Sequence, residues 1–385
     1  MRSVVVAKYV PWPPNSGDKR RTLGVVRALL ERGEVTVCAL AGEDEDSGPL
    51  QEEGVKVLGV RPRRSASHLA QGLARGRSLT AARFWNPALA RSVRREAAFG
   101  TDVLLVEHVQ LLPYTHGTSA RFTVLNMHNI ESSLTARYAA SQHGPKRALL
   151  HLEALALRRL ELGATGTDAV AVVSESDRLK LAAITNLPHV IVVPNAWTAP
   201  TPLAAAPDPV VCLVALLSWG PNIDAAVWFC REVWPRVTEQ LPEARLLLVG
   251  RNPAAAVKAL AGPTVEVTGT VPDLTPYYRR SRLAVAPLRS GGGSRLKILE
   301  ALAHGRALVA TTIGAEGLED LVGRGVVVVD DPAQMAVKVL ELLRDPGAAA
   351  RLGSLGAAAV AEDHSWTAAT RPLMDLIDSK LGRTS

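Results

Sequence analysis

The stretch from Leu283 to Thr311, LAVAPLRSGGGSRLKILEALAHGRALVAT, decides the fold expected for this chain. It reads as a short apolar strand, a glycine-rich turn, an amphipathic helix and a second apolar strand. Both strands are continuously hydrophobic rather than alternating, which is typical of a parallel sheet covered on both faces. The glycines then fall at the carboxyl end of a strand, where ligands bind in open α/β sheets.

The glycine-rich turn has the chemistry of an anion site. Its three glycines let the backbone approach an anion without a Cβ, and the helix that opens near Ser294 offers unpaired N–H groups and a positive dipole end. Lys297 adds a formal charge. Glu300 lies roughly 10 Å further on at about 1.5 Å per residue, which is far enough to reach a ribose. The simpler alternative is an ordinary βα loop with a solvated Lys and Glu.

The strand pattern predicts two domains, because 385 residues are too many for one ordinary core. Apolar runs recur before residue 198 at Ser3–Tyr9, Glu34–Leu40, Val55–Val60, Asp102–Glu107, Phe122–Met127, Ala169–Val173 and Val190–Val193. They resume after residue 209 at Val210–Leu216, Ala244–Val249, Thr264–Val267, Arg282–Ala286, Arg306–Thr311 and Gly325–Asp330. Helical stretches separate them, so two doubly wound α/β domains are expected.

A proline-rich segment separates the two sets of strands. Residues 198–209, TAPTPLAAAPDP, hold four prolines and no periodic pattern, which suits a linker. We therefore expect an N-terminal Rossmann-like domain over residues 1–200 and a C-terminal one over residues 201–365. Residues 366–385 read as a last helix that packs back on the first domain.

The cysteines and the hydropathy pattern predict a cytoplasmic protein. Cys38, Cys212 and Cys230 are far apart and lie in or beside apolar runs, so they read as buried thiols rather than a disulfide framework or a zinc site. No apolar run reaches 18 residues, and the N-terminal residues lack the pattern of a signal peptide.

The net charge of +7 favours an anionic partner. Nine arginines and no acidic residue occur from Arg61 to Arg95, with Phe84 and Trp85 among them. Such a segment suits peripheral contact with the inner face of a membrane, an anionic acceptor or nucleic acid. A solvated surface is the competing interpretation.

Further glycine or proline turns follow other strands. Ser16, Gly17 and Asp18 lie at the first strand-to-helix turn, GRN at residues 250–252 follows the second strand of the second domain, and GTVPDL at residues 269–274 follows the third. Each turn alone is a weak signal. Parallel strands end at one edge, so these turns are expected near the same crevice as the glycine-rich turn.

Five motifs in this order make the resemblance specific: WGPNIDAAVWF, VGRNP, GTVPDL, APLRSGGGSRLKILEALAHG and TTIGAEGL. Residues 210–320 resemble the C-terminal half of GT-B-fold glycosyltransferases of family 4, in particular the bacterial branch with a G-x-R-x-K-x-L-E-A core. PPNSGDKRR, HNIES and VVSESD match the N-terminal half more weakly. The resemblance implies two Rossmann-like domains that face each other across a cleft. It also implies transfer of a hexose-type sugar, with retention, from a nucleotide diphosphate sugar.

The resemblance also assigns site residues. The implied donor-binding residues are Gly17, Arg251, Val271, Pro272, Gly292, Gly293, Ser294 and Glu300. His128, Lys297 and Arg295 are the implied catalytic residues, and Glu107 and His108 are candidates for acceptor contacts. UDP is the favoured nucleotide, with GDP as the alternative, and the acceptor is a small molecule, a natural product or a lipid-linked group. No metal and no other cofactor are expected.

Two positions depart from the family pattern. The family often has a carboxylate eight residues before Glu300, where this chain has Gly292. The basic pair expected in the first loop of the C-terminal half is absent from ALLSWGPNID at residues 215–224. A sugar epimerase of the same double fold is one alternative function. A basic protein that binds membrane or nucleic acid is another, although no nucleic-acid module is recognisable and nucleic acid is not the expected partner.

Overall fold

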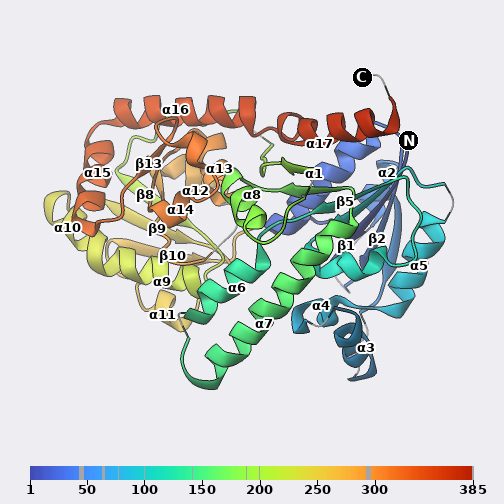
Figure 1. Ribbon diagram of the computed structural model, residues 1–385. Coiled ribbons are helices and arrows are strands. Elements are labelled where there is room, and N and C mark those ends of the chain that lie inside the picture. Colours follow the sequence, from blue (N-terminus) through green and yellow to red (C-terminus); the bar gives the residue numbers. More distant parts are fainter. Residues whose placement is uncertain are drawn as a thin grey trace. The chain divides into compact units, whose positions relative to one another are not determined.

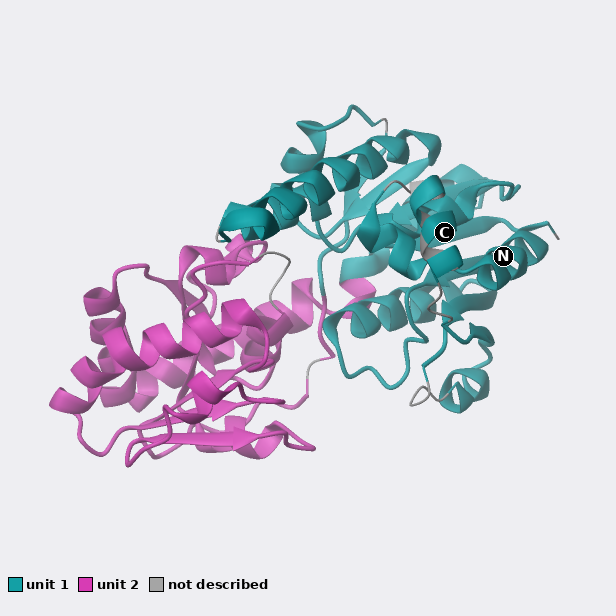
Figure 2. Cartoon of the chain, turned by 90° about the horizontal axis from the view of Figure 1, so that it is seen from below, with its two compact units in different colours: residues 1–195, 369–385 teal, residues 196–368 magenta. Residues whose placement is uncertain are grey.

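The computed structural model describes residues 1–42, 47–62, 66–76, 78–98, 100–140, 142–187, 189–198, 200–291 and 296–383. The chain forms two compact units, one of residues 1–195 and 369–385 and one of residues 196–368 (Figure 2). The first unit is discontinuous because the last helix, α17 (Trp366–Leu381), contributes to it. The proline-rich segment expected as a linker belongs to the second unit.

The first unit is built on a parallel sheet of seven strands in the order β3-β2-β1-β4-β5-β6-β7. The strands are β1 (Arg2–Ala7), β2 (Glu34–Leu40), β3 (Lys56–Val60), β4 (Val103–Glu107), β5 (Phe122–Asn126), β6 (Ala169–Val172) and β7 (Val190–Val192). Val4 and Val6 join one hydrophobic cluster, whereas Val5 and Ala7 join another. Each face of the sheet thus has its own core, which explains why the strands read as continuous apolar runs.

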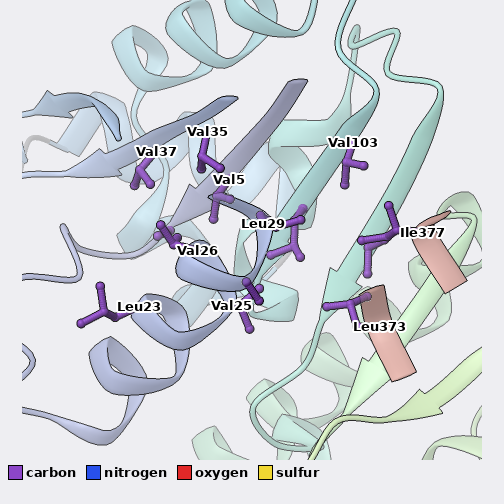
Figure 3. Close-up of a cluster of buried hydrophobic side chains, with 14 of the residues drawn as sticks. Val5, Leu23, Val25, Val26, Leu29, Val35, Val37, Val103, Leu373 and Ile377 are labelled. Carbon is purple, nitrogen blue, oxygen red and sulfur yellow. The ribbon is translucent and has the colours of Figure 1, made fainter. Parts of the chain in front are cut away.

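Helices cover both faces of this sheet (Figure 1). They are α1 (Gly17–Leu30), α2 (Gly48–Glu52), α3 (Ala66–Gly76), α4 (Leu79–Phe84), α5 (Pro87–Ala97), α6 (Glu131–Ala140), α7 (Gly144–Leu162) and α8 (Glu175–Ala182). Leu373 and Ile377 of α17 pack with Leu29 of α1 and Val103 of β4 in one buried cluster (Figure 3). The C-terminal helix is therefore part of the first unit's core.

The second unit repeats the architecture with six parallel strands in the order β10-β9-β8-β11-β12-β13. They are β8 (Val210–Val214), β9 (Arg245–Val249), β10 (Val265–Gly269), β11 (Leu283–Ala286), β12 (Ala307–Ala310) and β13 (Val326–Val328). Val211 and Leu213 face one core and Cys212 faces the other, as in the first unit. These two parallel sheets confirm the expected doubly wound α/β architecture.

The helices of the second unit lie between and after these strands. They are α9 (Gly220–Trp228), a π-helical segment (Phe229–Val233), α10 (Trp234–Gln240), α11 (Ala255–Lys258), α12 (Thr275–Arg280), α13 (Leu296–Ala303), α14 (Thr312–Ala315), α15 (Pro332–Arg344) and α16 (Pro346–Asp363). None of the helices in the described part of the chain is both long and apolar enough to cross a bilayer.

Two buried arginines attach the proline-rich segment to the second unit. Arg306 donates to the carbonyl oxygens of Leu203 and Ala204 at 2.7 and 2.6 Å. Arg282 donates to the carbonyls of Ala206 and Pro207. Prolines have no N–H and leave carbonyls without a regular partner, so the guanidinium groups supply the donors that a sheet or helix would otherwise provide.

Candidate functional site

The predicted residues of the first unit lie where its strand order reverses. From β1 the sheet grows to β2 and β3 on one side, and the chain then returns so that β4 pairs with the other side of β1. Ligands bind at the carboxyl ends of strands at such a switch point. Glu107 ends β4, His108 follows it, His128 follows β5, and Gly17 begins α1 after β1. Topology alone thus brings these four positions to one edge of the sheet.

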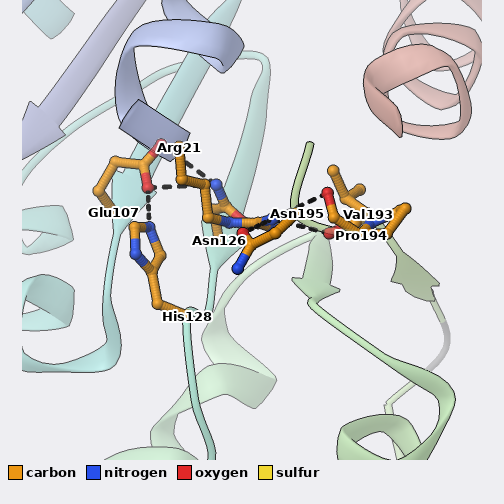
Figure 4. A network of polar contacts seen from close by, with 7 residues as sticks. All are labelled: Arg21, Glu107, Asn126, His128, Val193, Pro194 and Asn195. Atoms are coloured by element: carbon orange, nitrogen blue, oxygen red, sulfur yellow. Dashed lines mark hydrogen bonds and ion pairs between the residues drawn. The ribbon is translucent and has the colours of Figure 1, made fainter. Parts of the chain in front are cut away.

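Glu107 is the centre of a buried polar cluster (Figure 4). Its carboxylate is fully buried and lies 2.5 Å from Nε2 of His128, which is itself 9% exposed. The Asn126 amide donates to both carboxylate oxygens at 3.1 Å. Neighbouring strand ends therefore supply a hydrogen-bonded carboxylate–imidazole pair, an arrangement that can orient an imidazole or exchange a proton with it.

Arg21 of α1 fixes the other side of this cluster. It donates from Nη2 to Oδ1 of Asn126 at 2.7 Å and from Nη1 to the carbonyl of Val193 at 2.8 Å and to Oδ1 of Asn195 at 3.0 Å. A third Nη1 contact reaches the carbonyl of Pro194 at 3.3 Å. Arg21 is 1% exposed, so these bonds are shielded from water and strengthened by the low local dielectric. The guanidinium ties α1 to the ends of β5 and β7.

His108 carries a strained backbone. Its φ of 76° and ψ of 141° lie in a region that residues with a Cβ rarely adopt. The ring stacks on His128 with centroids 3.6 Å apart, and its Nδ1 is buried without a hydrogen-bond partner. Strain and an unsatisfied polar atom are both costly, and they persist mainly where the site uses them. An Nδ1 without a partner inside the protein is compatible with the predicted role of His108 in acceptor contacts.

Burial controls the titration of the cluster. It raises the pKa of Glu107 to about 7, and the nearby Arg21 guanidinium and the Asn126 amide oppose part of that rise. It lowers the pKa of His128 well below the usual value, with repulsion from Arg21 and Lys8 acting in the same direction. The pKa of His108 is lowered well below its usual value by burial and by its contact with His128. Both imidazoles are therefore neutral at pH 7, while Glu107 titrates near it.

The same three side chains have the spacing of a metal site. The ligand atoms of Glu107, His108 and His128 all lie within 4.8 Å of one another. Two observations favour the hydrogen-bonded pair over a bound cation. His128 Nε2 and the Glu107 carboxylate are 2.5 Å apart, in direct hydrogen-bonding contact. Arg21 and Lys8 place two positive charges nearby, which repel a divalent cation.

The second unit has its own switch point, between β8 and β11. The loop after β8 leads into α9, and the glycine-rich turn after β11 leads into α13. Lys297 in the first turn of α13 donates to Oδ1 of Asn222 in the first turn of α9 at 2.8 Å. Asn222 in turn donates to the carbonyl of Leu216 at 2.9 Å. One ammonium group thus connects two helix starts, whose dipoles both favour an anion.

Gly291 shows why this turn needs glycine. Its φ is 112°, and a Cβ there would lie 3.1 Å from the ring of Trp219 in the loop before α9. The loop before α9 and the turn before α13 therefore approach each other closely at Trp219 and Gly291. Gly292, Gly293, Ser294 and Arg295, which the sequence assigned to the same turn, lie outside the described residues.

The remaining predicted donor residues lie on other loops of the second unit. Glu300 is half-buried on α13, one turn after Lys297, and Arg251 is exposed after β9. Val271 is half-buried and Pro272 exposed after β10. The loop with Arg251 and the loop with Val271 and Pro272 both follow carboxyl ends of strands in the same sheet, and α13 follows the carboxyl end of β11. His304, which directly follows α13, is instead buried and stacks on Tyr278 with centroids 4.6 Å apart.

Sequence reasoning missed Arg21 and Asn222. In DKRRTLG, Arg21 looks like one of several solvated charges at a helix start, and nothing local marks it as buried. In WGPNID, Asn222 looks like an ordinary polar residue at a helix start. The one available signal is that this loop lacks the basic pair implied by the resemblance, so Lys297 had to find a polar partner there other than a charged one.

Comparison with known protein families gives a match within the second unit. Residues 208–345 match the family model for group 1 glycosyl transferases. The matched glycosyltransferase region contains all six strands of the second sheet and both Asn222 and Lys297. A curated relative, an uncharacterized 44.6 kDa protein in the cps region of Klebsiella pneumoniae, is 24% identical over 139 residues. That match covers 34% of this chain and spans only about a third, 36%, of the relative's length.

Solved structures match over both units. Sucrose-phosphate synthase from Thermosynechococcus elongatus has a TM-score of 0.71 at 15% identity and covers 99% of this chain and 100% of its own. HepE of Anabaena in complex with UDP and glucose has a TM-score of 0.69 at 15% identity, with 98% and 100% covered. A UDP-forming α,α-trehalose-phosphate synthase from Burkholderia vietnamiensis gives 0.66 at 14%, also with 98% and 100% covered. The chain thus has the GT-B fold of glycosyltransferases.

Proposed function

We propose that this protein is a retaining glycosyltransferase that moves a hexose-type sugar from a nucleotide diphosphate sugar to a small-molecule, natural-product or lipid-linked acceptor. The contact between Lys297 and Asn222 carries the proposal, because it connects two helix starts at the switch point of the matched region. UDP is the favoured nucleotide and GDP the alternative. Two proteins of the same fold support UDP, one solved with UDP and glucose and one described as UDP-forming.

The proposed chemistry follows from where charge develops. Cleavage of the anomeric C–O bond leaves negative charge on the diphosphate and oxocarbenium character on the sugar. Lys297 and the N–H groups at the starts of α9 and α13 stabilise the departing diphosphate electrostatically. Glu300, one turn further along α13, binds the ribose hydroxyls. Attack on the face from which the diphosphate leaves retains the anomeric configuration without a protein nucleophile.

The polar cluster of the first unit positions the transferred sugar and the acceptor. His128 is held by Glu107 on one side and by the His108 ring on the other. A neutral imidazole fixed in this way offers a directed hydrogen bond to a hydroxyl. His108, whose Nδ1 is buried without a partner, contacts the acceptor in this proposal.

We also propose that the reaction needs no metal ion. Lys297 and the N–H groups at the starts of α9 and α13 take the charge-neutralising role that a divalent cation has in other transferases. Treatment with EDTA followed by gel filtration should leave the rate of sugar transfer unchanged. A rate that falls and returns on addition of magnesium, manganese or zinc would show that a cation takes part.

A nucleotide panel tests the donor site. The melting temperature of the whole chain is measured with UDP, GDP, ADP and dTDP, because a ligand at 100 times its dissociation constant adds about 2.7 kcal/mol. UDP should give the largest increase. Lys297→Met should remove most of that increase, whereas Lys338→Met, at an exposed position on α15, should retain it.

The outcomes separate the competing functions. No stabilisation by any nucleotide contradicts a donor site in the second unit. A preferred nucleotide together with conversion of its sugar donor in the absence of any acceptor indicates an epimerase. Transfer to an acceptor with inverted configuration, read from the anomeric coupling in the NMR spectrum of the product, contradicts retention.

A further inference from the structure

Exposed leucines and arginines share the outer face of α7. Leu152 is 65% exposed and Leu155 is 57% exposed, although both are large apolar side chains. At about 100° per residue, Leu152, Leu155 and Arg159 point to one side of the helix and the buried Leu157 points to the other. Leu149, one turn earlier, is 53% exposed. We call these three leucines with Arg158 and Arg159 the α7 outer face.

The acidic residues of α7 point away from this face. Glu153 accepts hydrogen bonds from the Ser78 hydroxyl at 2.6 Å and from the N–H of Leu79 at 2.9 Å, at the start of α4. Glu161 accepts from the backbone and hydroxyl of Ser132 at the start of α6. The carboxylates of α7 are thus used inside the protein, and the charged side chains that α7 presents to solvent are basic.

A pocket opens beside the α7 outer face. It has a volume of about 430 Å³ and lies among α6, α7 and α8, and Leu155 forms part of its wall. Arg158, His151 and Lys180 also line it. Lys180 is paired with Asp177 of its own helix at 3.4 Å. Arg158 is exposed and adds a further positive charge to the wall. The wall thus combines apolar contact with cationic donors, which suits a phosphate headgroup with its glycerol.

We propose that the α7 outer face binds the surface of an anionic lipid bilayer, with its leucines at the acyl boundary and its arginines at the phosphates. The combination of exposed leucines with exposed basic side chains is typical of helices that lie in a bilayer interface. Basic residues next to an anionic leaflet add attraction that leucines alone do not provide. The inference is independent of the proposed transferase activity.

A second copy of this chain fits the face less well. In a symmetric pair the same patch meets itself, so Arg158 and Arg159 of one copy would approach those of the other. The carboxylates of α7 are buried against α4 and α6 and are not available to pair with them. A surface of fixed negative charge has no such conflict.

The segment from Arg61 to Arg95, which the sequence suggested for membrane contact, presents a different surface. Its described arginines include Arg83 and Arg91, which are exposed. Its Trp85 points inward, because it stacks on Tyr114 with centroids 4.9 Å apart and is 7% exposed, and Phe84 is partly buried. In the described part of this segment Leu79 is 42% exposed, whereas α7 presents three leucines that are 53–65% exposed.

Vesicle sedimentation tests the proposal with the whole chain. Vesicles of phosphatidylcholine alone are compared with equal mixtures of phosphatidylcholine and phosphatidylglycerol. The protein should bind the mixed vesicles and bind less as salt increases. The double variant Leu152→Ser with Leu155→Ser should lose about tenfold or more of its partition coefficient. Leu355→Ser, a 55% exposed leucine on α16, is the matched control and should bind as the unmodified protein does.

Charge variants complete the test. Arg158→Gln with Arg159→Gln should lower binding to the mixed vesicles about tenfold or more. Arg83→Gln with Arg91→Gln should change it less, and a larger loss there than on α7 would overturn the proposal. Melting curves confirm that each variant is folded.

Three further results would also overturn it. These are no binding of the unmodified protein to the mixed vesicles, equal binding to neutral and mixed vesicles, and unchanged binding of the double leucine variant. Light scattering that shows a dimer lost on leucine replacement, without vesicle binding, would assign the face to a second copy of the chain.

Discussion

Replacing Glu107 by Gln should make the protein more stable and less active. The buried carboxyl has a pKa of about 7 in the folded chain, against 4.5 for its ordinary value. Because the folded pKa is the higher one, the folded state holds a proton between these values that the unfolded state has already released. The free energy of unfolding therefore falls as pH rises through this window, and the cost is complete above pH 7.

The size of the effect follows from the two pKa values. At about 1.4 kcal/mol per pKa unit, the raised pKa of Glu107 lowers the free energy of unfolding by about 3 kcal/mol at pH 8 and by about 1 kcal/mol at pH 5. A Gln side chain has the same shape and no charge to desolvate. Its amide oxygen can accept from Asn126, and its N–H can donate to His128 Nε2 when the imidazole proton is on Nδ1. The contact with His128 and one of the two contacts with Asn126 thus remain while the charge is lost.

The assay is a pair of melting curves at each pH from 5 to 8.5. The melting temperature of Glu107→Gln should exceed that of the unmodified protein by roughly 6–12 °C at pH 8, at about 2–4 °C per kcal/mol for a unit of this size. The excess should shrink at pH 5. Glu52→Gln, an exposed carboxylate on α2 of the same unit, is the control and should show no such trend.

The same variant should transfer sugar more slowly, because an amide cannot hold His128 through a charge-assisted bond. In the unmodified protein kcat/KM should rise as Glu107 ionises near pH 7, and this rise should be absent from the Gln variant. A stability difference that is constant from pH 5 to 8.5, or a variant less stable than the unmodified protein at pH 8, would refute the reasoning.

Three further predictions concern the second unit and the thiols. Gly314→Ala should destabilise the protein by about 1–3 kcal/mol, because a Cβ there would lie 2.1 Å from the carbonyl oxygen of Ala286. Gly262→Ala, where the same atom meets nothing within 4 Å, is the control, and equal urea midpoints for the two variants would contradict the packing argument. Arg306→Met should cost roughly 3 kcal/mol, since four buried or half-buried carbonyl contacts lose their donor, and a urea midpoint close to that of the unmodified protein would contradict this role. Burial raises the pKa of Cys38 to about 12, so its alkylation by iodoacetamide at pH 8 should be slow until urea unfolds the chain, and rapid alkylation of the native protein would show the thiol to be accessible.

Strand positions were predictable because both faces of each sheet are buried. The thirteen strands in the described part of the chain fall on the apolar runs seen in the sequence, with ends that differ by at most two residues. A strand buried on both faces needs an apolar side chain at nearly every position, so its sequence is distinctive. The last helix was predictable for a related reason, since Leu373, Met374 and Ile377 form an apolar stripe that needs a partner.

The candidate site was predictable in position but not in detail. Glu107 and His128 follow neighbouring strands, so their proximity could be inferred from topology. The backbone strain at His108 has no local signal, since neither glycine nor asparagine marks it. The burial of Arg21 depends on carbonyls at residues 193 and 194, more than 170 positions away, and no local pattern contains that information.

The return of α17 to the first unit has a consequence for synthesis on the ribosome. The second unit is continuous in sequence and ends at residue 368, so it can fold as soon as those residues have left the exit tunnel. The first unit starts earlier but lacks Leu373, Met374 and Ile377 until the second unit has been synthesised. Part of one apolar face of its sheet therefore stays uncovered while more than 170 residues are added. During that interval the nascent chain has a binding surface for chaperones that the finished protein does not have.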